Sequence, residues 1–408
     1  MKALQIRRNI ARFGAARVVG AVSPSGATKV GPLEYRTIED PERPGDGWHR
    51  VRTRLAGICG SDLSLIGGRA STYFESWVSF PFVPGHEVVG ELVDGDEAGT
   101  RVVLEPVLGH AARDFPLPFD GARPADGDDY AHLAVTSQDG VEPAIQTGFC
   151  CSTGGGWAPW FWAHESQLHR LNLPINDLPD ERAVLIEPFA GGIHAALLAA
   201  PIVEGRANPV VAVLGAGTMG LAAIAGLRRY IPDIRIVVGA RYPHQRELAL
   251  AFGADVVVTA TELDRAVRRE VGCHMLGGGE SGALSSGADV TIDAVGSSRS
   301  IADSLRITRP RGRVVLLGMP AHVELDLTGL WHREIDLKGA YTYGTETLSD
   351  GTVTDTFHLA IDTVTAVEAE RLLSATYSLD EHLDAIDHAA TAGRRGAIKI
   401  AFDLRESN

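Results

Sequence analysis

Short segments in which apolar and polar residues alternate fill the first 190 residues, and glycine and proline interrupt them repeatedly. Examples are "HRVRTRLAGICG" and "GHEVVGELV", whose two-residue period is typical of half-buried β-strands. The chain start, "MKALQIRRNIARFGAARVVG", is expected to give a first strand and a turn. We therefore predict a β-rich domain over residues 1–190.

A different pattern extends from about Pro209 to Met319, where β-rich runs alternate with helical stretches. The runs "VVAVLG", "IRIVVG", "ADVVVT", "ADVTIDAVG" and "GRVVLLG" are separated by stretches such as "LAAIAGLRRYI" and "RELALAFG". This alternation is typical of a doubly wound parallel sheet with crossover helices, so the predicted class is α/β. We assign residues 191–335 to this domain and expect residues 336–408 to return to the first one.

Composition limits the function classes. A chain of 408 residues with 45 % apolar content can bury two cores, and its formal net charge of −14 disfavours nucleic acid and anionic membranes as partners. The uncharged run from Val210 to Leu227 is long enough for a membrane span, but three glycines in its first half indicate strand, loop and helix. Four cysteines without a CxxC pair favour a cytoplasmic protein.

The sequence "GAGTMG" places a GxGxxG motif between a β-run and an alanine-rich helix, which is the context that dinucleotide binding requires. Its first glycine allows a tight turn, the second lets the backbone approach a pyrophosphate, and the third permits close packing of helix and strand. The predicted cofactor-binding residues of this motif are Gly215, Gly217, Thr218, Met219 and Gly220.

The end of the next strand, "IRIVVGARYPHQR", indicates which cofactor binds. An NAD site normally carries an acid there for the ribose 2′-hydroxyl, but Gly239 and Ala240 occupy these positions. Arg241 follows and can bind a 2′-phosphate, and we include Arg246 in the same site. NADP is therefore predicted; the alternative is that Arg241 is a solvated loop residue and either cofactor is accepted.

Polar residues also interrupt apolar segments elsewhere. In "FPFVPGHEVVGELV", His86 and Glu87 are adjacent, and in a strand they would point to opposite faces. Cys59 and Glu187 likewise lie in apolar surroundings. A thiolate, an imidazole and carboxylates suit zinc, whose charge would offset the burial of the anions.

Five segments together resemble the zinc-dependent medium-chain dehydrogenase/reductase superfamily, nearest to its sorbitol and threonine dehydrogenase-like polyol branch. They are "AGICGSDLSLIGG", "VPGHEVVGEL", "LIEPFAGGIHAAL", "VLGAGTMGLAAI" and "GRVVLLGMP". The resemblance implies a GroES-like β-rich catalytic domain, a Rossmann domain, a substrate cleft between them, and hydride transfer between a nicotinamide cofactor and an alcohol or carbonyl compound.

The resemblance also implies roles for individual residues. Cys59, His86 and Glu187 would be ligands of one catalytic zinc, with Glu87 as a further ligand that alternates with water or substrate. Ser61 would relay the substrate hydroxyl proton, and Asp62 would hold the far nitrogen of His86. Val295, Leu317 and Gly318 would lie near the nicotinamide.

One departure from the family is clear. Many relatives hold a structural zinc with four cysteines in a lobe that corresponds to Leu108–Gly148, which contains no cysteine here. A structural zinc is therefore not expected, and His110 and His132 in this lobe are interpreted as parts of a solvated loop. We expect a homodimer or homotetramer.

Several other residues are assigned to packing. These are the adjacent Cys150 and Cys151, His194, and the aromatic residues Phe74, Trp157, Trp160, Phe161 and Trp162. Trp77 is the best candidate among the aromatic residues for a substrate contact. Two other functions stay open: a reductase of the same fold that uses little zinc and acts on an activated C=C or C=N bond, and a dinucleotide-binding protein without activity.

Overall fold

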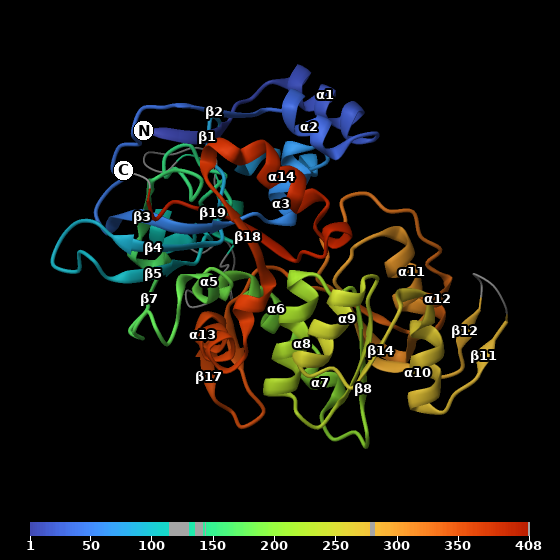
Figure 1. The fold of residues 1–408 in the computed structure, drawn as a ribbon. Coiled ribbons are helices and arrows are strands. Elements are labelled where there is room, and N and C mark those ends of the chain that lie inside the picture. Colours follow the sequence, from blue (N-terminus) through green and yellow to red (C-terminus); the bar gives the residue numbers. More distant parts are fainter. Residues whose placement is uncertain (114–129, 135–141, 143, 278–281, 407–408) are drawn as a thin grey trace. The chain divides into compact units, whose positions relative to one another are not determined.

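The computed structural model describes residues 1–113, 130–134, 142, 144–277 and 282–406 (Figure 1). The chain forms two compact units, Met1–Glu187 with Glu368–Asn408, and Pro188–Val367. Residues 336–367 therefore belong to the second unit, where the sequence pattern assigned them to the first. The reason is that β15 (Asp336–Gly339) extends the parallel sheet of the second unit.

The first unit contains a seven-stranded, largely antiparallel sheet with the order β18-β19-β3-β4-β5-β7, and β6 pairs with β3. Alternate residues of these strands pack into one apolar core that includes Val51, Val88 and Phe402. The strands are β3 (Trp48–Gly57), β4 (Val88–Leu92), β5 (Arg101–Leu104), β6 (Trp160–His164), β7 (Leu168–Arg170), β18 (Leu373–Tyr377) and β19 (Lys399–Asp403).

The beginning of the first unit differs from the prediction. Strands β1 (Lys2–Ile6) and β2 (Leu33–Thr37) pair with each other, but two helices, α1 (Ile10–Gly20) and α2 (Pro24–Val30), stand where a turn was predicted. Asn9 and Ser23 start these helices because their side chains accept backbone N–H groups of the first turn. The other helices of this unit are α3 (Gly60–Ile66), α4 (His110–Arg113), α5 (Asp180–Ala183) and α14 (His382–Ala390).

The second unit is built on a six-stranded parallel sheet with the order β10-β9-β8-β13-β14-β15. The predicted β-runs are confirmed as strands. They are β8 (Val210–Leu214), β9 (Arg235–Gly239), β10 (Val256–Val258), β13 (Ala288–Asp293) and β14 (Thr308–Leu316). Two short ribbons, β11 (Met275–Leu276) with β12 (Ala283–Leu284) and β16 (Thr345–Thr347) with β17 (Val353–Asp355), complete the unit.

Helices connect the parallel strands as the alternation of runs predicts. They are α8 (Thr218–Tyr230), α9 (Pro243–Ala251), α10 (Leu263–Val271), α11 (Ser298–Ile307) and α12 (Thr328–His332). In the chain, α7 (Ala200–Val203) precedes the first strand of the sheet and α13 (Thr356–Ala366) follows the last, while α6 (Ile186–Leu197) begins at the boundary of the units. The run from Val210 to Leu227 is strand, turn and helix as expected. The stretch Asp180–Val203 is apolar and long enough for a membrane span by composition, but most of it is buried in the protein.

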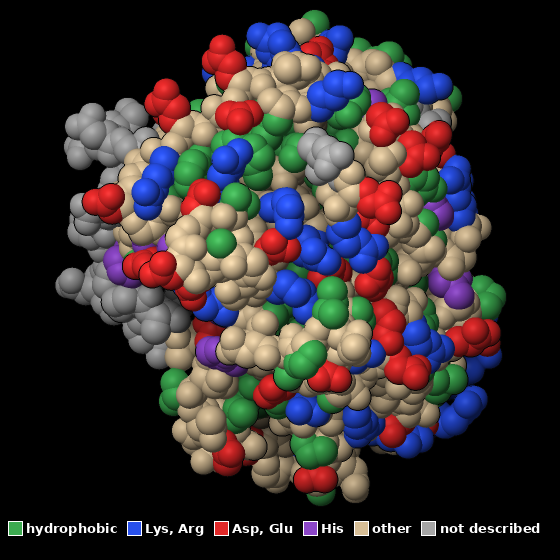
Figure 2. Space-filling model, turned by 60° about the vertical axis from the view of Figure 1, so that its left-hand side comes forward, with side chains coloured by type: hydrophobic (Ala, Val, Ile, Leu, Met, Phe, Trp, Pro, Cys, Tyr) green, Lys and Arg blue, Asp and Glu red, His purple; other side chains and the backbone are tan. Residues whose placement is uncertain are grey.

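Charged side chains of both signs are interspersed on the face in Figure 2. The expectation that polyanions are not the main partners stays a prediction from the net charge.

Candidate active site

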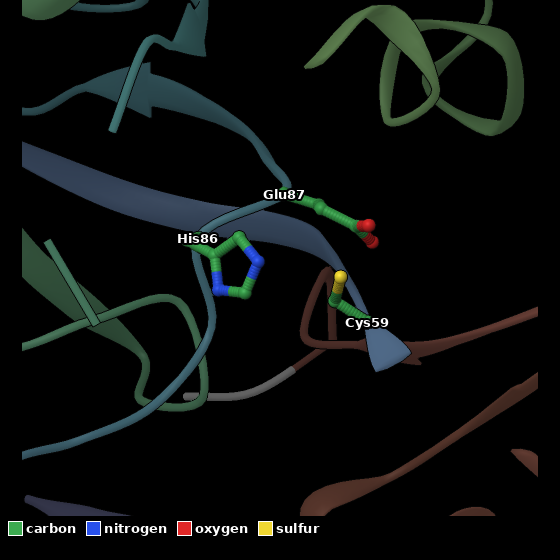
Figure 3. Close-up of side chains that lie close together, drawn as sticks. All are labelled: Cys59, His86 and Glu87. Carbon is green, nitrogen blue, oxygen red and sulfur yellow. The ribbon is translucent and has the colours of Figure 1, made fainter. Parts of the chain in front are cut away.

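Cys59, His86 and Glu87 converge in the first unit (Figure 3). The Cys59 sulfur, a ring nitrogen of His86 and a carboxylate oxygen of Glu87 all lie within 4.8 Å of one another. His86 and Glu87 are 4 % and 1 % exposed. These three side chains therefore bring together one half-buried thiol, one buried imidazole and one buried carboxylate. Glu87, predicted as a further ligand, takes part in this set, whereas Glu187 does not.

The local backbone explains how two adjacent residues face the same space. His86 and Glu87 stand just before β4, which begins only at Val88, and Gly85 before them has a φ of 97°. The strict alternation predicted for a strand thus does not apply to this pair. Cys59 is the N-cap residue of α3 and follows the end of β3 by two positions.

Glu187 lies in the first turn of α6 and acts electrostatically on His86, so it faces the same cluster, although it is not part of the tight set of three. Asp180, the first residue of α5, anchors the segment that precedes Glu187. This fully buried carboxylate accepts hydrogen bonds from Arg54 at 2.8 Å and from Arg101 at 2.9 Å. The approach of Glu187 to the cluster is therefore held by ion pairs at the start of α5.

Lys399 is a site residue that the sequence analysis missed. It is the first residue of β19, is 4 % exposed, and forms an ion pair with Glu87. Burial lowers the pKa of Lys399, but Glu87, Cys59 and Glu187 outweigh that effect and raise it. A lysine inside the apolar run "AIKIAF" was the signal that could have revealed it.

Gly57, the last residue of β3, makes room for this pair. A Cβ at this position would collide with the Glu87 carboxylate and would lie 3.0 Å from Cε of Lys399. The backbone N–H of Gly57 also donates to the Glu87 carbonyl at 2.8 Å. Glycine is therefore required here by the close approach of two buried side chains.

Ser61 and Asp62 lie next to His86, where the resemblance puts a proton relay and an orienting acid. Ser61 Oγ is 3.4 Å from His86 Nε2. Asp62 Oδ1 is 3.6 Å from His86 Nδ1, which is longer than a hydrogen bond, and both atoms are buried without a partner in the described structure. The other Asp62 oxygen accepts the N–H of Cys59 at 2.9 Å.

The charges of the cluster suit a cation. Burial is the largest effect on His86 and lowers its pKa, yet Asp62, Cys59 and Glu187 together raise the pKa of His86 to about 10. Desolvation likewise raises the pKa of Asp62. The raised pKa shows that negative charge surrounds the buried imidazole. A divalent ion with sulfur, nitrogen and oxygen ligands would neutralise that charge. The residues thus fit zinc.

The cofactor motif has the geometry that its sequence predicts. Gly215, after β8, has a φ of 90°, and a Cβ on Gly220 would collide with the Gly215 carbonyl. Gly217 is the N-cap residue of α8, and a Cβ there would meet no atom within 4 Å. Thr218 and Met219 form the first turn of α8. The exposed backbone around Gly217 leaves space for a pyrophosphate at the helix N-terminus.

Arg241 and Arg246 follow β9. Arg241 is exposed and its guanidinium carbon lies 5.4 Å from the centre of the Tyr242 ring, whereas Ala240 is fully buried. Arg246 donates to the carbonyls of Ala240 at 3.3 Å and Arg241 at 3.2 Å, so it braces the turn that carries Arg241. Arg241 is thus free to reach a ligand.

The two predicted nicotinamide turns follow β13 and β14. Val295 is 53 % exposed, while Leu317 is 6 % exposed, so Leu317 can contribute mainly through its backbone. Gly318 packs its backbone against the turn that carries Val295. These residues all lie at the carboxyl edge of the parallel sheet, where ligands of doubly wound folds bind.

Most of the remaining assignments concern packing. Trp157 and Phe161 are fully buried as expected, but His194 pairs with Glu346 at 2.7 Å and is not merely packed. Trp77 contacts the ring of His132, with centroids 5.2 Å apart. His132 is only 5 % exposed, so its assignment to a solvated loop was wrong. Much of the lobe Leu108–Gly148 lies outside the described residues, so the prediction for the rest of the lobe stays a prediction.

Two protein families match the chain. Residues 45–173 match the alcohol dehydrogenase GroES-like domain, and residues 218–365 match the zinc-binding dehydrogenase family. The first range lies in the first unit and includes the Cys59 cluster, and the second lies in the second unit and begins at Thr218, within the cofactor motif.

Among curated relatives, the erythritol/L-threitol dehydrogenase of Mycolicibacterium smegmatis is 28 % identical, with 76 % of this chain and 81 % of the relative covered. The sorbitol dehydrogenase of Bacillus subtilis is 26 % identical, with 83 % and 85 % covered. Both relatives thus match over most of their length.

Solved structures share the fold over nearly the whole chain. The 2R,3R-butanediol dehydrogenase of Bacillus subtilis has a TM-score of 0.67 at 19 % identity and covers 98 % of this chain and 99 % of its own. A protein of Sinorhizobium meliloti 1021 solved with NADP has a TM-score of 0.66 at 22 % identity, with 99 % of both chains covered. With both domain families matched in order, the chain belongs to the zinc-dependent medium-chain dehydrogenase/reductase superfamily and is a nicotinamide-dependent oxidoreductase.

Proposed function

We propose that this chain interconverts a secondary alcohol or polyol and the matching ketone or aldehyde, with one catalytic zinc per chain and with NADP preferred over NAD. The observation that carries the proposal is the convergence of half-buried Cys59 with buried His86 and Glu87, with Glu187 acting on His86. The names of the relatives, which include erythritol, threitol and sorbitol dehydrogenases, support the substrate class.

The side chains have distinct roles in this proposal. Cys59, His86 and Glu187 would hold the ion, and Glu87 would stay paired with Lys399 or join the ligands. Bound zinc would supply Lewis-acid stabilisation of negative charge on the substrate oxygen. Bound nicotinamide would exchange a hydride with the substrate carbon.

Proton movement falls to this chain's own residues. Ser61 Oγ, which lies beside His86, would accept the substrate hydroxyl proton and pass it outward. Asp62 would accept the Nδ1–H of His86 once the two atoms close from 3.6 Å to hydrogen-bond distance, which leaves Nε2 as the ligand atom. We further propose a cytoplasmic homodimer or homotetramer, since a reducing compartment keeps Cys59 available as a thiolate.

The preference for NADP rests on Arg241 and is tested by Arg241→Ala. Loss of a charged contact to the 2′-phosphate should weaken NADPH about 10- to 100-fold, while NADH changes less than about twofold. Fluorescence titration of both cofactors measures this. Arg235→Ala, at the opposite end of the same strand, is the matched control and should change neither affinity. Equal weakening of NADPH and NADH by Arg241→Ala would refute the preference.

Substrate class is tested by a panel of secondary alcohols, polyols, ketones and aldehydes, assayed with both cofactors. Turnover of at least one alcohol and carbonyl pair is expected, and activity that persists after zinc removal would contradict the mechanism. An enone or imine reduced by zinc-free protein would favour the reductase reading.

A further inference from the structure

The strand order indicates over which strands each half of a bound dinucleotide would lie. In the sheet, β8 lies between β9 and β13. The chain runs from β8 to β9 and β10 on one side and then crosses to β13 on the other side, so the strand order reverses between β8 and β13. A dinucleotide lies across the carboxyl ends of the strands at such a point. Because Arg241 after β9 would take the adenosine half, the nicotinamide half would extend over β13 and β14.

Asp293 ends β13 on this nicotinamide side and is fully buried. Its Oδ1 accepts the backbone N–H of Val295 at 2.8 Å and of Gly296 at 3.1 Å, and its Oδ2 accepts the hydroxyl of Ser300 at 2.8 Å. Burial raises the pKa of this carboxyl, and the same three hydrogen bonds oppose that rise. The side chain thus fixes the turn after its own strand.

The main chain of Asp293 fixes a second turn. Its carbonyl oxygen accepts the N–H of Leu317 at 3.0 Å and of Gly318 at 2.7 Å, both from the segment after β14. One residue therefore joins the Val295–Gly296 turn, through its carboxylate, to the Leu317–Gly318 turn, through its carbonyl.

The two turns pack backbone against backbone. Among the described residues, no flexible side chain lies between them that could adjust if one turn moved. A Cβ on Gly296 would lie 2.9 Å from the carbonyl carbon of Gly318, and a Cβ on Gly318 would collide with the N atom of Gly296. Val295 also contacts the glycine turn after β8, since a Cβ on Gly215 would lie 2.7 Å from Cγ2 of Val295. A shift of the Val295–Gly296 turn would move the surface beside the cofactor.

We propose that Asp293 is a positioning residue for the nicotinamide ring. It touches neither cofactor nor substrate, and it acts by holding Val295 and the Leu317–Gly318 turn in one arrangement. This inference rests on the proposed function, because it requires that a nicotinamide dinucleotide binds at this sheet edge.

The test compares two ligands that differ only in the nicotinamide. Asp293→Ala removes the acceptor of two turn N–H groups, so NADPH should bind about tenfold more weakly, while 2′-phospho-ADP-ribose, which has no nicotinamide, should change less than about twofold. Asp293→Asn, which keeps one oxygen for both N–H groups, should restore most of the NADPH affinity. Asp303→Ala is the matched control, since this carboxylate pairs with Arg299 and Arg306 within α11, and its loss should change neither affinity.

A second variant covers the case in which Asp293→Ala does not fold. Gly296→Ala should separate the two turns, because its Cβ would press on Gly318, and it should weaken NADPH selectively in the same way. Equal loss of both ligands, or loss of neither, would overturn the role of Asp293. A wild-type protein that binds neither NADPH nor 2′-phospho-ADP-ribose would instead overturn the proposed function, so the two failures are distinguishable.

Discussion

Replacing Cys59 by serine should abolish turnover and leave cofactor binding intact. A serine hydroxyl is not ionised near neutral pH and is a poor zinc ligand, whereas the thiolate binds the ion directly. Loss of about 4 kcal/mol of Lewis-acid stabilisation corresponds to roughly a thousandfold lower kcat. Steady-state kinetics and NADPH titration of the same protein sample measure both quantities.

Cys151→Ser provides the control for Cys59→Ser. Cys151 is a free cysteine of the same unit whose thiol lies 4.0 Å from Ser152 Oγ, and it is not part of the set of Cys59, His86 and Glu87. Its replacement should leave kcat within about twofold of wild type, because the half-buried Cys151 supplies no ligand atom to the set. A Cys59→Ser protein with full activity would remove the zinc mechanism, even if the control behaves as expected.

Replacing Lys399 by methionine should cost about 3–5 kcal/mol of the free energy of unfolding, because the change leaves the buried Glu87 carboxylate without its partner. The two side chains are 4 % and 2 % exposed, so solvent cannot compensate the charge. Denaturant unfolding with a chelator present measures the loss without a contribution from bound metal.

A double variant tests whether the loss comes from the pair. Lys399→Met with Glu87→Gln removes both charges and should recover a large part of the stability that Lys399→Met loses. Lys338→Met, an exposed lysine on β15, should change stability by less than about 0.5 kcal/mol. A loss below about 1 kcal/mol for Lys399→Met, or no recovery in the double variant, would refute the importance of this pair.

The parts of the site that depend on local sequence were predictable. Gly215 has a φ of 90°, and a Cβ on Gly220 would collide with the Gly215 carbonyl, so the sequence motif alone was enough to assign these two glycines. Residues 10–30 were mispredicted although Asn9 and Ser23 carry ordinary helix start signals. The arginine-rich, weakly periodic sequence between them concealed these signals.

The parts that depend on distant segments were not predictable from residue patterns alone. Lys399 and Glu87 meet because β19 pairs with β3, and no feature near either residue specifies that pairing. The same limit applies to Asp293, whose carbonyl bonds reach the turn after β14. His86 and Glu87 were suggestive together, but only the late start of β4 explains how both face one site.

Zinc content of the purified protein tests the central claim most directly. Elemental analysis of wild type beside Cys59→Ser should give one zinc per wild-type chain and close to none in the variant, because the predicted zinc site needs the Cys59 thiolate and residues 108–148 contain no cysteine for a structural site. Two zinc ions per chain would contradict the absence of a structural site. No zinc in the wild type, after expression with zinc supplied, would contradict the metal-dependent mechanism itself.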